Sequence, residues 1–165
     1  MHDILTRPEL RFVIRPARVE EAAALTELSL RSKAVWGYDA SFLARCRLAM
    51  QVKAAAIERQ PHFVAEAAGA APGRILGFYG FEPEAEGVGL DYLFVEPDVI
   101  GRGVGTALWR HAVETARALG HSALIVVADP NAEGFYRRMG ARPIGAQGSD
   151  LERGRLLPVL RFPLE

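Results

Sequence analysis

The sequence predicts a single domain of the α/β class, with about seven strands and helices around them. Seven short segments rich in apolar and β-branched residues have the composition of strands, and helical segments interrupt them in the order β-α-α-β-β-β-α-β-α-β-β. The chain has 165 residues, of which 50% are hydrophobic, so one compact core can form without disulfides or metal. We therefore expect one domain over residues 1–165, with a flexible tail at 1–8.

The first half of the chain predicts a strand, two helices and a hairpin. Leucines near one side of residues 19–33, with two glutamates at the start of that segment, indicate a helix. Trp36-Gly37-Tyr38 interrupts this pattern, and Asp39 or Ser41 can cap a second helix over residues 42–56. The predicted strands of this half are 12–16, 62–67 and 75–81, and the last two form a hairpin through a turn at 69–73.

The second half predicts a strand, a helix and a strand, followed by a short helix and two closing strands. Residues 104–119 place apolar side chains on one helical face, and Gly120 is the expected stop. The almost continuous apolar run at 123–128 is typical of a strand covered on both faces, which places it centrally, next to its predecessor. Asp129 and Pro130 can start the short helix. The remaining predicted strands are 90–95, 141–146 and 156–162.

A glycine-rich turn with Gly101, Gly103 and Gly105 lies between the strand at 90–95 and the helix at 104–119. Alternate glycines let an anion approach the backbone, and the next helix points free N–H groups and its positive dipole end at the same place. The spacing does not match the Gly-x-Gly-x-x-Gly of dinucleotide-binding folds, and the lysine of a P-loop is missing. The turn therefore predicts a site for another phosphorylated small molecule.

Charge and cysteine content exclude several classes of partner. Lys plus Arg and Asp plus Glu number 20 each, so no overall field attracts nucleic acid or an anionic membrane. The single cysteine, Cys46, excludes an internal disulfide and a cysteine-based zinc cluster, and no histidine has a partner at metal-binding spacing. No apolar run approaches the roughly 20 residues of a membrane span. We expect no metal, no nucleic acid, no membrane and a cytoplasmic location.

The glycine turn resembles the acyl-CoA pyrophosphate loop of the GNAT superfamily of N-acetyltransferases, whose pattern Gln/Arg-x-x-Gly-x-Gly/Ala follows a strand. Ile100 stands where the family has Gln or Arg. In relatives this position contributes a main-chain N–H, which isoleucine retains, so only a side-chain contribution would be lost. The resemblance covers most of the chain and rests on residues 93–97, 100–105, 129–132 and 135–141, while 32–38 resemble a segment of uncharacterised bacterial members.

The resemblance implies a GNAT fold, in which a mixed, mostly antiparallel twisted sheet is flanked by helices and the parallel strands at 89–95 and 122–128 splay apart. It also implies transfer of acetyl from acetyl-CoA to the primary amine of a small-molecule acceptor, by direct attack on the thioester. A homodimer is one assembly that the family suggests. The alternatives are a non-catalytic acyl-CoA-binding sensor or scaffold domain, and an unrelated phosphate-binding domain whose strands would not splay.

The resemblance assigns cofactor binding to the strand, the turn and the short helix. Pantetheine would pair with main-chain groups of Leu93 and Val95, and Asn131 would hydrogen-bond it rather than only begin its helix. Arg102 and Arg138 could meet CoA phosphates, although arginines at such places are often only solvated. The full predicted set is Leu93, Phe94, Val95, Ile100, Gly101, Arg102, Gly103, Val104, Gly105, Thr106, Asn131, Phe135, Tyr136 and Arg138.

Two residues are the candidates for proton transfer. Alternation along a strand places residues 89, 91, 93 and 95 on one face, so Asp91 would lie beside the thioester and could act as a general base. Because an ordinary aspartate has a pKa of about 3.9, this role needs burial or a water relay; Asp91 could instead orient the substrate ammonium. Tyr136 matches the family tyrosine that donates a proton to the thiolate, and the alternative is a core-edge role.

Three residues are candidates for binding the acceptor. Trp36 and Tyr38 lie in the segment between the first two helices, which family members use to wall the acceptor pocket. There they would favour a flat, apolar or cationic group, while packing of Trp36 over the sheet is the competing interpretation. Glu82 and Glu84, at the end of the preceding strand, are alternatives to Asp91 as the base, and Glu82 is also a candidate contact for the amine. The competing interpretation is that both are solvated turn residues.

Overall fold

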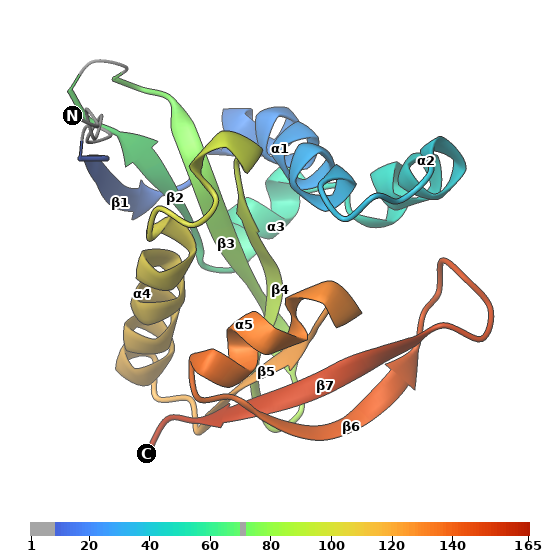
Figure 1. Ribbon diagram of the computed structural model, residues 1–165. Helices are drawn as coiled ribbons and strands as arrows, with labels where there is room; N and C mark the ends of the chain where they lie inside the picture. Colours follow the sequence, from blue (N-terminus) through green and yellow to red (C-terminus); the bar gives the residue numbers. More distant parts are fainter. Residues whose placement is uncertain (1–8, 70–71) are drawn as a thin grey trace, which may run out of the picture.

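The structure is a computed structural model that describes residues 9–69 and 72–165 (Figure 1). The predicted flexible tail at 1–8 lies outside the described residues. One seven-stranded sheet has the order β1-β2-β3-β4-β5-β7-β6, which confirms the predicted class and strand number. The strands are β1 (Phe12–Pro16), β2 (His62–Ala67), β3 (Ile75–Glu84), β4 (Gly87–Val95), β5 (Ala123–Val127), β6 (Arg142–Gly148) and β7 (Leu156–Pro163). The helices are η1 (Val19–Glu21), α1 (Ala22–Ala34), α2 (Ala40–Ala49), α3 (Ala54–Arg59), η2 (Pro97–Val99), α4 (Val104–Ala118), η3 (Pro130–Ala132) and α5 (Glu133–Arg138).

The parallel strands β4 and β5 are paired over only part of their length. All other neighbouring strands run antiparallel. The parallel pairing joins Val88–Leu90 to Leu124–Val126 and goes no further. Beyond Leu90, β4 continues beside β3 alone, while β5 continues beside β7. The splay predicted between these two strands is therefore confirmed.

Strand β4 contains a β-bulge at Asp91. Leu90 lies opposite Phe81, and Tyr92 lies opposite Gly80, so Asp91 is the one residue between them that has no partner in β3. A bulge of this kind bends the strand and changes where its side chains point. The bend occurs directly after the last residue paired with β5, so the bulge and the splay are at the same place in the sheet.

The bulge also corrects the predicted assignment of faces along β4. Leu90 before the bulge, and Leu93 and Val95 after it, all pack in or against the same hydrophobic cluster. Regular alternation would have put residues an odd number apart on opposite faces. The prediction that residue 89 shares a face with 93 and 95 is therefore wrong, because Asp91 is an extra residue that shifts the alternation by one position.

Helices cover both faces of the sheet. On one face, Leu108 and Trp109 of α4 and Tyr136 of α5 belong to the larger buried cluster. On the other face, Leu28 of α1 and Ile57 of α3 belong to a second cluster. The two clusters lie on opposite sides of β3 and β4, so these central strands are buried on both faces.

The helices differ from the prediction in two places. The single helix predicted over residues 42–56 is two helices, α2 and α3. Tertiary hydrogen bonds hold the break open, because the Val52 N–H donates to Thr26 Oγ1 over 2.9 Å and Tyr92 donates to the Gln51 carbonyl over 3.2 Å. Leu119, predicted on the buried face of α4, is 54% exposed because the helix ends one residue before it.

Gly87 provides a test of the pairing between β4 and β5. Its φ is +123°, and a Cβ built on it would lie 2.2 Å from the carbonyl oxygen of Ala123. Gly87→Ala therefore adds backbone strain and a clash, and we expect it to lower the free energy of unfolding by about 3 kcal/mol in urea denaturation. Gly120→Ala is the matched control, because Gly120 has a φ of +82° but open space around its Cβ position.

We expect the control to cost only about 1 kcal/mol, because it adds strain without a clash. Equal losses for the two variants would show that the close approach of β4 to Ala123 does not contribute to stability.

Candidate active site

The glycine turn presents unpaired backbone donors at the start of α4. Gly101 and Gly103 have φ values of +79° and +89°, so the turn needs glycine at both positions. The Ala107 N–H donates to the Gly103 carbonyl over 3.0 Å and starts the helical ladder. In the described chain, no carbonyl accepts a hydrogen bond from the N–H groups of residues 103–106. These donors and the helix dipole make the turn suitable for an anion.

The glycine turn is continuous with the open edge of β4. A Cβ built on Gly105 would lie 3.6 Å from both Val95 and Phe135, so all three residues meet where α4 begins. The Glu96 N–H points toward β3, because it donates to the Leu76 carbonyl over 2.8 Å. Residues 93 and 95 alternate with residue 96 and therefore direct their N–H groups to the opposite edge, where β5 has separated.

A groove of about 280 Å³ occupies the space where β4 and β5 separate. We call it the β4–β5 groove. Its walls come from α1 and the segment after it, from the bulged part of β4, from the end of β5 and from the loop between β6 and β7. The lining residues are Ser32, Lys33, Trp36, Ala49, Met50, Leu90, Asp91, Tyr92, Leu93, Phe94, Val126, Val127, Ala128, Asp129, Ala132, Tyr136, Leu151 and Leu157.

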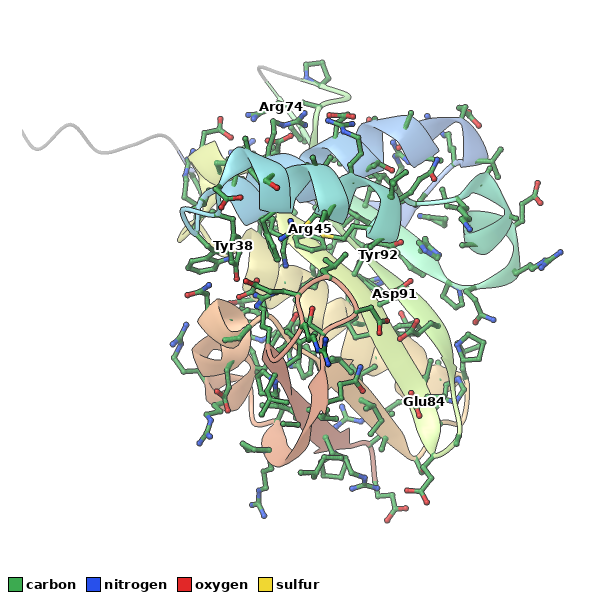
Figure 2. The ribbon with its side chains drawn as sticks, turned by 90° about the vertical axis from the view of Figure 1, so that its right-hand side faces the viewer. Tyr38, Arg45, Arg74, Glu84, Asp91 and Tyr92 are labelled. Carbon is green, nitrogen blue, oxygen red and sulfur yellow. The ribbon has the colours of Figure 1, made fainter. Side chains whose placement is uncertain are left out.

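Asp91 projects from the bulge at one wall of this groove. Figure 2 shows it next to Tyr92. Although its side chain is partly exposed, the surrounding protein removes enough water to raise its pKa to about 7, and the carboxylate of Glu82 adds to this effect. Glu82 lies opposite Gly89 in the hairpin, and burial with repulsion from Glu84 raises its own pKa. Asp91 can therefore exchange a proton near neutral pH.

Tyr136 of α5 also lines the groove. Its side chain is 6% exposed and packs edge-on against Trp109, with ring centroids 5.6 Å apart. Burial raises the pKa of its phenol, so the hydroxyl keeps its proton at neutral pH. Within the part of the chain that the structure describes, no hydrogen-bond partner of this hydroxyl is found. The proton is thus free for a ligand in the groove.

Asn131 and Tyr38 are joined by a polar cluster at the end of β5. The Asn131 side-chain amide donates to Tyr38 Oη over 3.1 Å and to Asp129 Oδ1 over 3.0 Å. Tyr38 in turn donates to Asp129 Oδ2 over 2.7 Å. We call Lys33, Tyr38, Asp129, Asn131 and Arg155 the Asp129 cluster. Since both amide protons of Asn131 are used, its side-chain carbonyl is the group left to accept a hydrogen bond.

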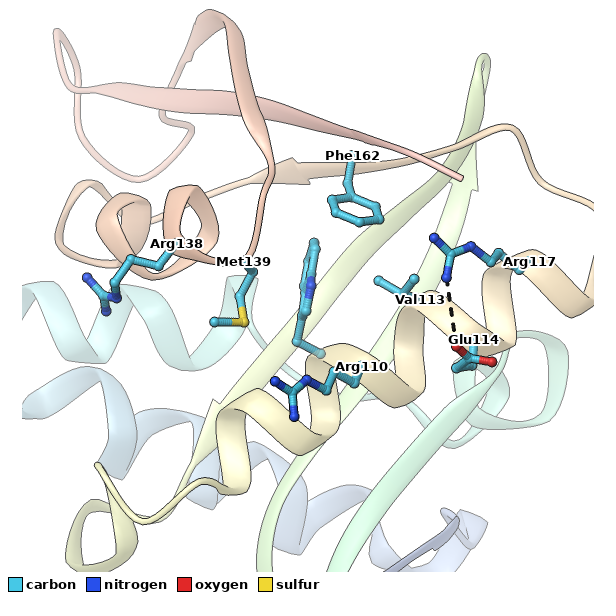
Figure 3. A pocket seen from close by; sticks show the side chains of 8 residues that line it. Arg110, Val113, Glu114, Arg117, Arg138, Met139 and Phe162 are labelled. Atoms are coloured by element: carbon cyan, nitrogen blue, oxygen red, sulfur yellow. Dashed lines mark ion pairs between the residues drawn. The ribbon is translucent and has the colours of Figure 1, made fainter. Parts of the chain in front are cut away.

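The structure separates the predicted site residues into four places. Trp36, Asp91, Leu93, Phe94 and Tyr136 line the β4–β5 groove. Val95 and Phe135 lie beside the glycine turn, while Tyr38 and Asn131 are in the Asp129 cluster. The side chain of Arg138 lies at a second cavity of about 330 Å³ between α4, α5 and β7 (Figure 3). The turn itself comprises Ile100, Gly101, Arg102, Gly103, Val104, Gly105 and Thr106.

Several groove residues escaped the sequence analysis. Lys33 sits in the last turn of α1, and Met50, Leu151 and Leu157 come from loop and strand ends far apart in the chain. No spacing links these residues, because the loop between β6 and β7 reaches the groove only through tertiary contacts. Arg155 of the Asp129 cluster, in the same loop, also escaped the sequence analysis.

The described part of the chain offers neither a metal site nor a membrane span. Among these residues, no three His, Cys, Asp or Glu side chains gather closely enough to hold a metal ion. No helix in the same residues has the length and apolar composition that crossing a bilayer requires.

The opening between β4 and β5, next to the unpaired N–H groups at the start of α4, matches the N-acetyltransferase architecture that the glycine turn led us to expect. Comparison of the sequence with protein families agrees, because the family described as Acetyltransferase (GNAT) matches residues 24–141. This chain belongs to that family. The resemblance noted from the glycine turn and the residues around it is thus confirmed.

A relative of known activity is similar to part of the chain. The peptidyl-lysine N-acetyltransferase YjaB of Salmonella typhimurium (strain LT2) is 35% identical over 73 residues, which are 44% of this chain and 48% of the relative. The match thus spans about half the length of that protein.

Solved structures share the fold over nearly the whole chain. A GCN5-related N-acetyltransferase from Rhodopseudomonas palustris has a TM-score of 0.75 at 24% identity, covering 92% of this chain and 95% of that one. The PaiA N-acetyltransferase of Thermoplasma acidophilum, in complex with coenzyme A, has a TM-score of 0.71 at 15% identity, covering 93% of this chain and 99% of that one. YncA of Salmonella typhimurium, with acetyl-CoA, has a TM-score of 0.65 at 20% identity, covering 94% of this chain and 95% of that one. At these identities the likeness establishes the fold.

The raised pKa of Asp91 predicts a pH-dependent stability difference for Asp91→Asn. The folded pKa of about 7 exceeds the ordinary 3.8, so ionisation costs stability as pH rises from about 4 to 7. Asn removes this cost, and we expect a higher melting temperature than wild type at pH 8, with the difference disappearing near pH 4. Glu86→Gln, exposed in the turn of the same hairpin, serves as the control and should change little.

A wild-type melting temperature equal to that of Asp91→Asn across this range would mean that Asp91 ionises in the folded protein at its ordinary pKa. Differential scanning calorimetry in buffers of matched ionic strength makes the comparison.

Proposed function

We propose that this protein is an acetyl-CoA-dependent N-acetyltransferase that acts on the primary amine of a small-molecule acceptor. The observation that carries the proposal is that unpaired N–H groups of the glycine turn lie beside Val95, on the open edge of the strand whose residues 90–94 line the β4–β5 groove together with Tyr136. Membership of the GNAT family supports the same reaction class.

The chain has groups suited to each part of acetyl-CoA. The N–H groups of residues 103–106 would bind the pyrophosphate, which needs no side chain from Ile100. The open edge of β4 at Leu93 and Val95 would pair with the pantetheine amides, and the free side-chain carbonyl of Asn131 would accept from one of them. When bound, acetyl-CoA supplies the acetyl group as a thioester.

Each reactive residue then has one task. Asp91 removes a proton from the acceptor ammonium, either directly or through water, and its pKa of about 7 makes it a base near neutral pH. A main-chain N–H of β4 stabilises the charge that develops on the carbonyl oxygen. Tyr136 gives its proton to the departing sulfur, because its hydroxyl is protonated and unpaired in the groove.

Two comparisons support an amine as the acceptor. The chain belongs to the acetyltransferase (GNAT) family, and one relative is named for acetylation of peptidyl-lysine. Trp36, Met50 and Leu151 give the groove an apolar side that can hold the body of a small amine. Thiol release from acetyl-CoA, measured with a library of primary amines and a lysine-containing peptide, tests the proposal. Binding of acetyl-CoA without thiol release for any amine would instead support the sensor or scaffold domain.

A charge placed in the glycine turn tests the cofactor assignment. Gly103→Glu puts a carboxylate beside the N–H groups of residues 103–106, and we expect CoA affinity to fall about 100-fold, or about 2.8 kcal/mol. Gly120→Glu is the matched control at the other end of α4, because both glycines have a positive φ and open space around the Cβ position. Isothermal calorimetry measures both affinities.

Unchanged affinity in Gly103→Glu, with a melting temperature equal to that of the control, would remove the turn from the cofactor site. An equal loss in both variants would point to instability of α4 rather than to a lost contact.

Tyr136→Phe tests the proposed acid. Removing the proton donor should lower kcat about 100-fold, within the range for general acid catalysis, while acetyl-CoA affinity stays within about twofold. Tyr79→Phe is the control, since Tyr79 is also buried but donates within the core to Thr115 over 3.0 Å. Equal kcat for Tyr136→Phe and wild type would exclude Tyr136 as the acid, provided that pre-steady-state kinetics show chemistry to be rate-limiting.

A further inference from the structure

Two cations share one carboxylate in the Asp129 cluster. Lys33 Nζ lies 3.0 Å from Asp129 Oδ2, and Arg155 Nη2 lies 3.4 Å from the same oxygen. The side chains of all three residues are nearly buried, with exposed fractions of 11% for Lys33, 14% for Arg155 and 11% for Asp129. The cluster therefore holds two positive charges against one negative charge.

No other group of the cluster supplies a second negative charge. Burial and the hydrogen bond to Asp129 raise the pKa of Tyr38 to about 12, so its hydroxyl is neutral at pH 7. Asn131 is uncharged. Among the residues that the structure describes, neither Lys33 nor Arg155 has an ion pair with any carboxylate except Asp129. The excess charge in the described cluster is thus one positive unit.

Aromatic rings offset part of the cost of this charge. The ammonium of Lys33 lies 5.4 Å from the ring centre of Tyr38, and the guanidinium of Arg155 lies 5.1 Å from the same ring. Both cations also face Phe42, at 5.9 and 5.0 Å. Such contacts offset only part of the cost of holding a nearly buried cation without its own counter-ion. An additional anion would therefore be bound favourably.

The β4–β5 groove gives such an anion access to the cluster. Lys33 and Asp129 both line the groove, and Trp36 lines it beside Lys33. Asp91, on β4, contributes the other acidic side chain to the lining. The groove is therefore electrically asymmetric, with a base for an ammonium on β4 and an excess positive charge at the end of α1.

We propose that Lys33 and Arg155 form the carboxylate subsite of the acceptor, so that the substrate is an amino acid or a closely related amine with a carboxylate. This assignment rests on the proposed function. The ammonium of the acceptor lies at Asp91, and its carboxylate pairs with Lys33 at the edge of the Asp129 cluster. The apolar remainder contacts Trp36 and Leu151. An amine without a carboxylate leaves the excess charge uncompensated, and the site discriminates against it.

Matched acceptor pairs test the subsite with the wild-type protein. L-phenylalanine is compared with phenethylamine, L-leucine with 3-methylbutylamine and L-lysine with 1,5-diaminopentane, by kcat/KM for thiol release from acetyl-CoA. We expect the acid to exceed its decarboxylated counterpart by about tenfold or more in at least one pair. Equal values, or a preference for the decarboxylated amine in every pair, would overturn the subsite and leave the proposed acetyltransferase function intact.

Variants show whether the named residues create the preference. The preference ratio is kcat/KM for the acid divided by kcat/KM for its decarboxylated counterpart. Lys33→Met and Arg155→Met should reduce this ratio to about one through a higher KM for the acid. Lys33→Arg, which keeps the positive charge, should have the ratio of the wild type. Arg153→Met is the control, because Arg153 lies in the same loop with an exposed side chain, and it should leave the ratio unchanged. A ratio that survives in Lys33→Met and Arg155→Met would place carboxylate recognition elsewhere.

If no amine is turned over, direct binding measurements test the carboxylate subsite. Calorimetry in the presence of CoA measures the affinity of the three amino acids and of their decarboxylated counterparts for the wild type. Amino-acid binding that Lys33→Met weakens about tenfold would support the subsite while the proposed catalytic function fails. No binding of any of the acids would overturn the subsite.

Discussion

The site depends on the incomplete pairing of β4 with β5. Three residues of each strand are joined, Val88–Leu90 to Leu124–Val126, and the strands then separate while each keeps its partner on the other side. Main-chain groups of β4 that would bond a neighbouring strand in an ordinary sheet are left open. Unpaired main-chain groups next to a groove are costly unless water or a ligand binds them, which makes this edge a place for an extended, amide-containing ligand.

Two local features maintain this opening from either end. At the paired end, the left-handed conformation of Gly87 lets the β4 backbone approach Ala123 more closely than a side chain would allow. At the open end, the bulge at Asp91 turns β4 and directs a carboxyl to the groove wall. The bulge that follows the last β4–β5 pair is thus also the position of the residue whose pKa burial and Glu82 raise to about 7.

Much of this arrangement could be predicted from short-range patterns. The glycine turn, its strand and α4 were readable because backbone conformation, apolar spacing and helix start signals all act within a few residues. The break between α2 and α3 was not, because it is held by contacts of Val52 with Thr26 and of Gln51 with Tyr92. The alternation along β4 failed for a similar reason, since a bulge is defined by the register of two strands.

The sequence by itself determined the class of fold, the order of the elements and the glycine turn, because these follow from residue type and local spacing. It singled out Asp91 and Tyr136 as candidates through the resemblance to a family. Only the tertiary structure decided how far β4 and β5 stay paired, which way Asp91 faces and that Lys33 and Arg155 meet at Asp129. Lys33 and Arg155 come from elements 122 positions apart in the chain. Packing brings them together around one carboxylate, and no periodicity along the chain encodes a charge balance of that kind.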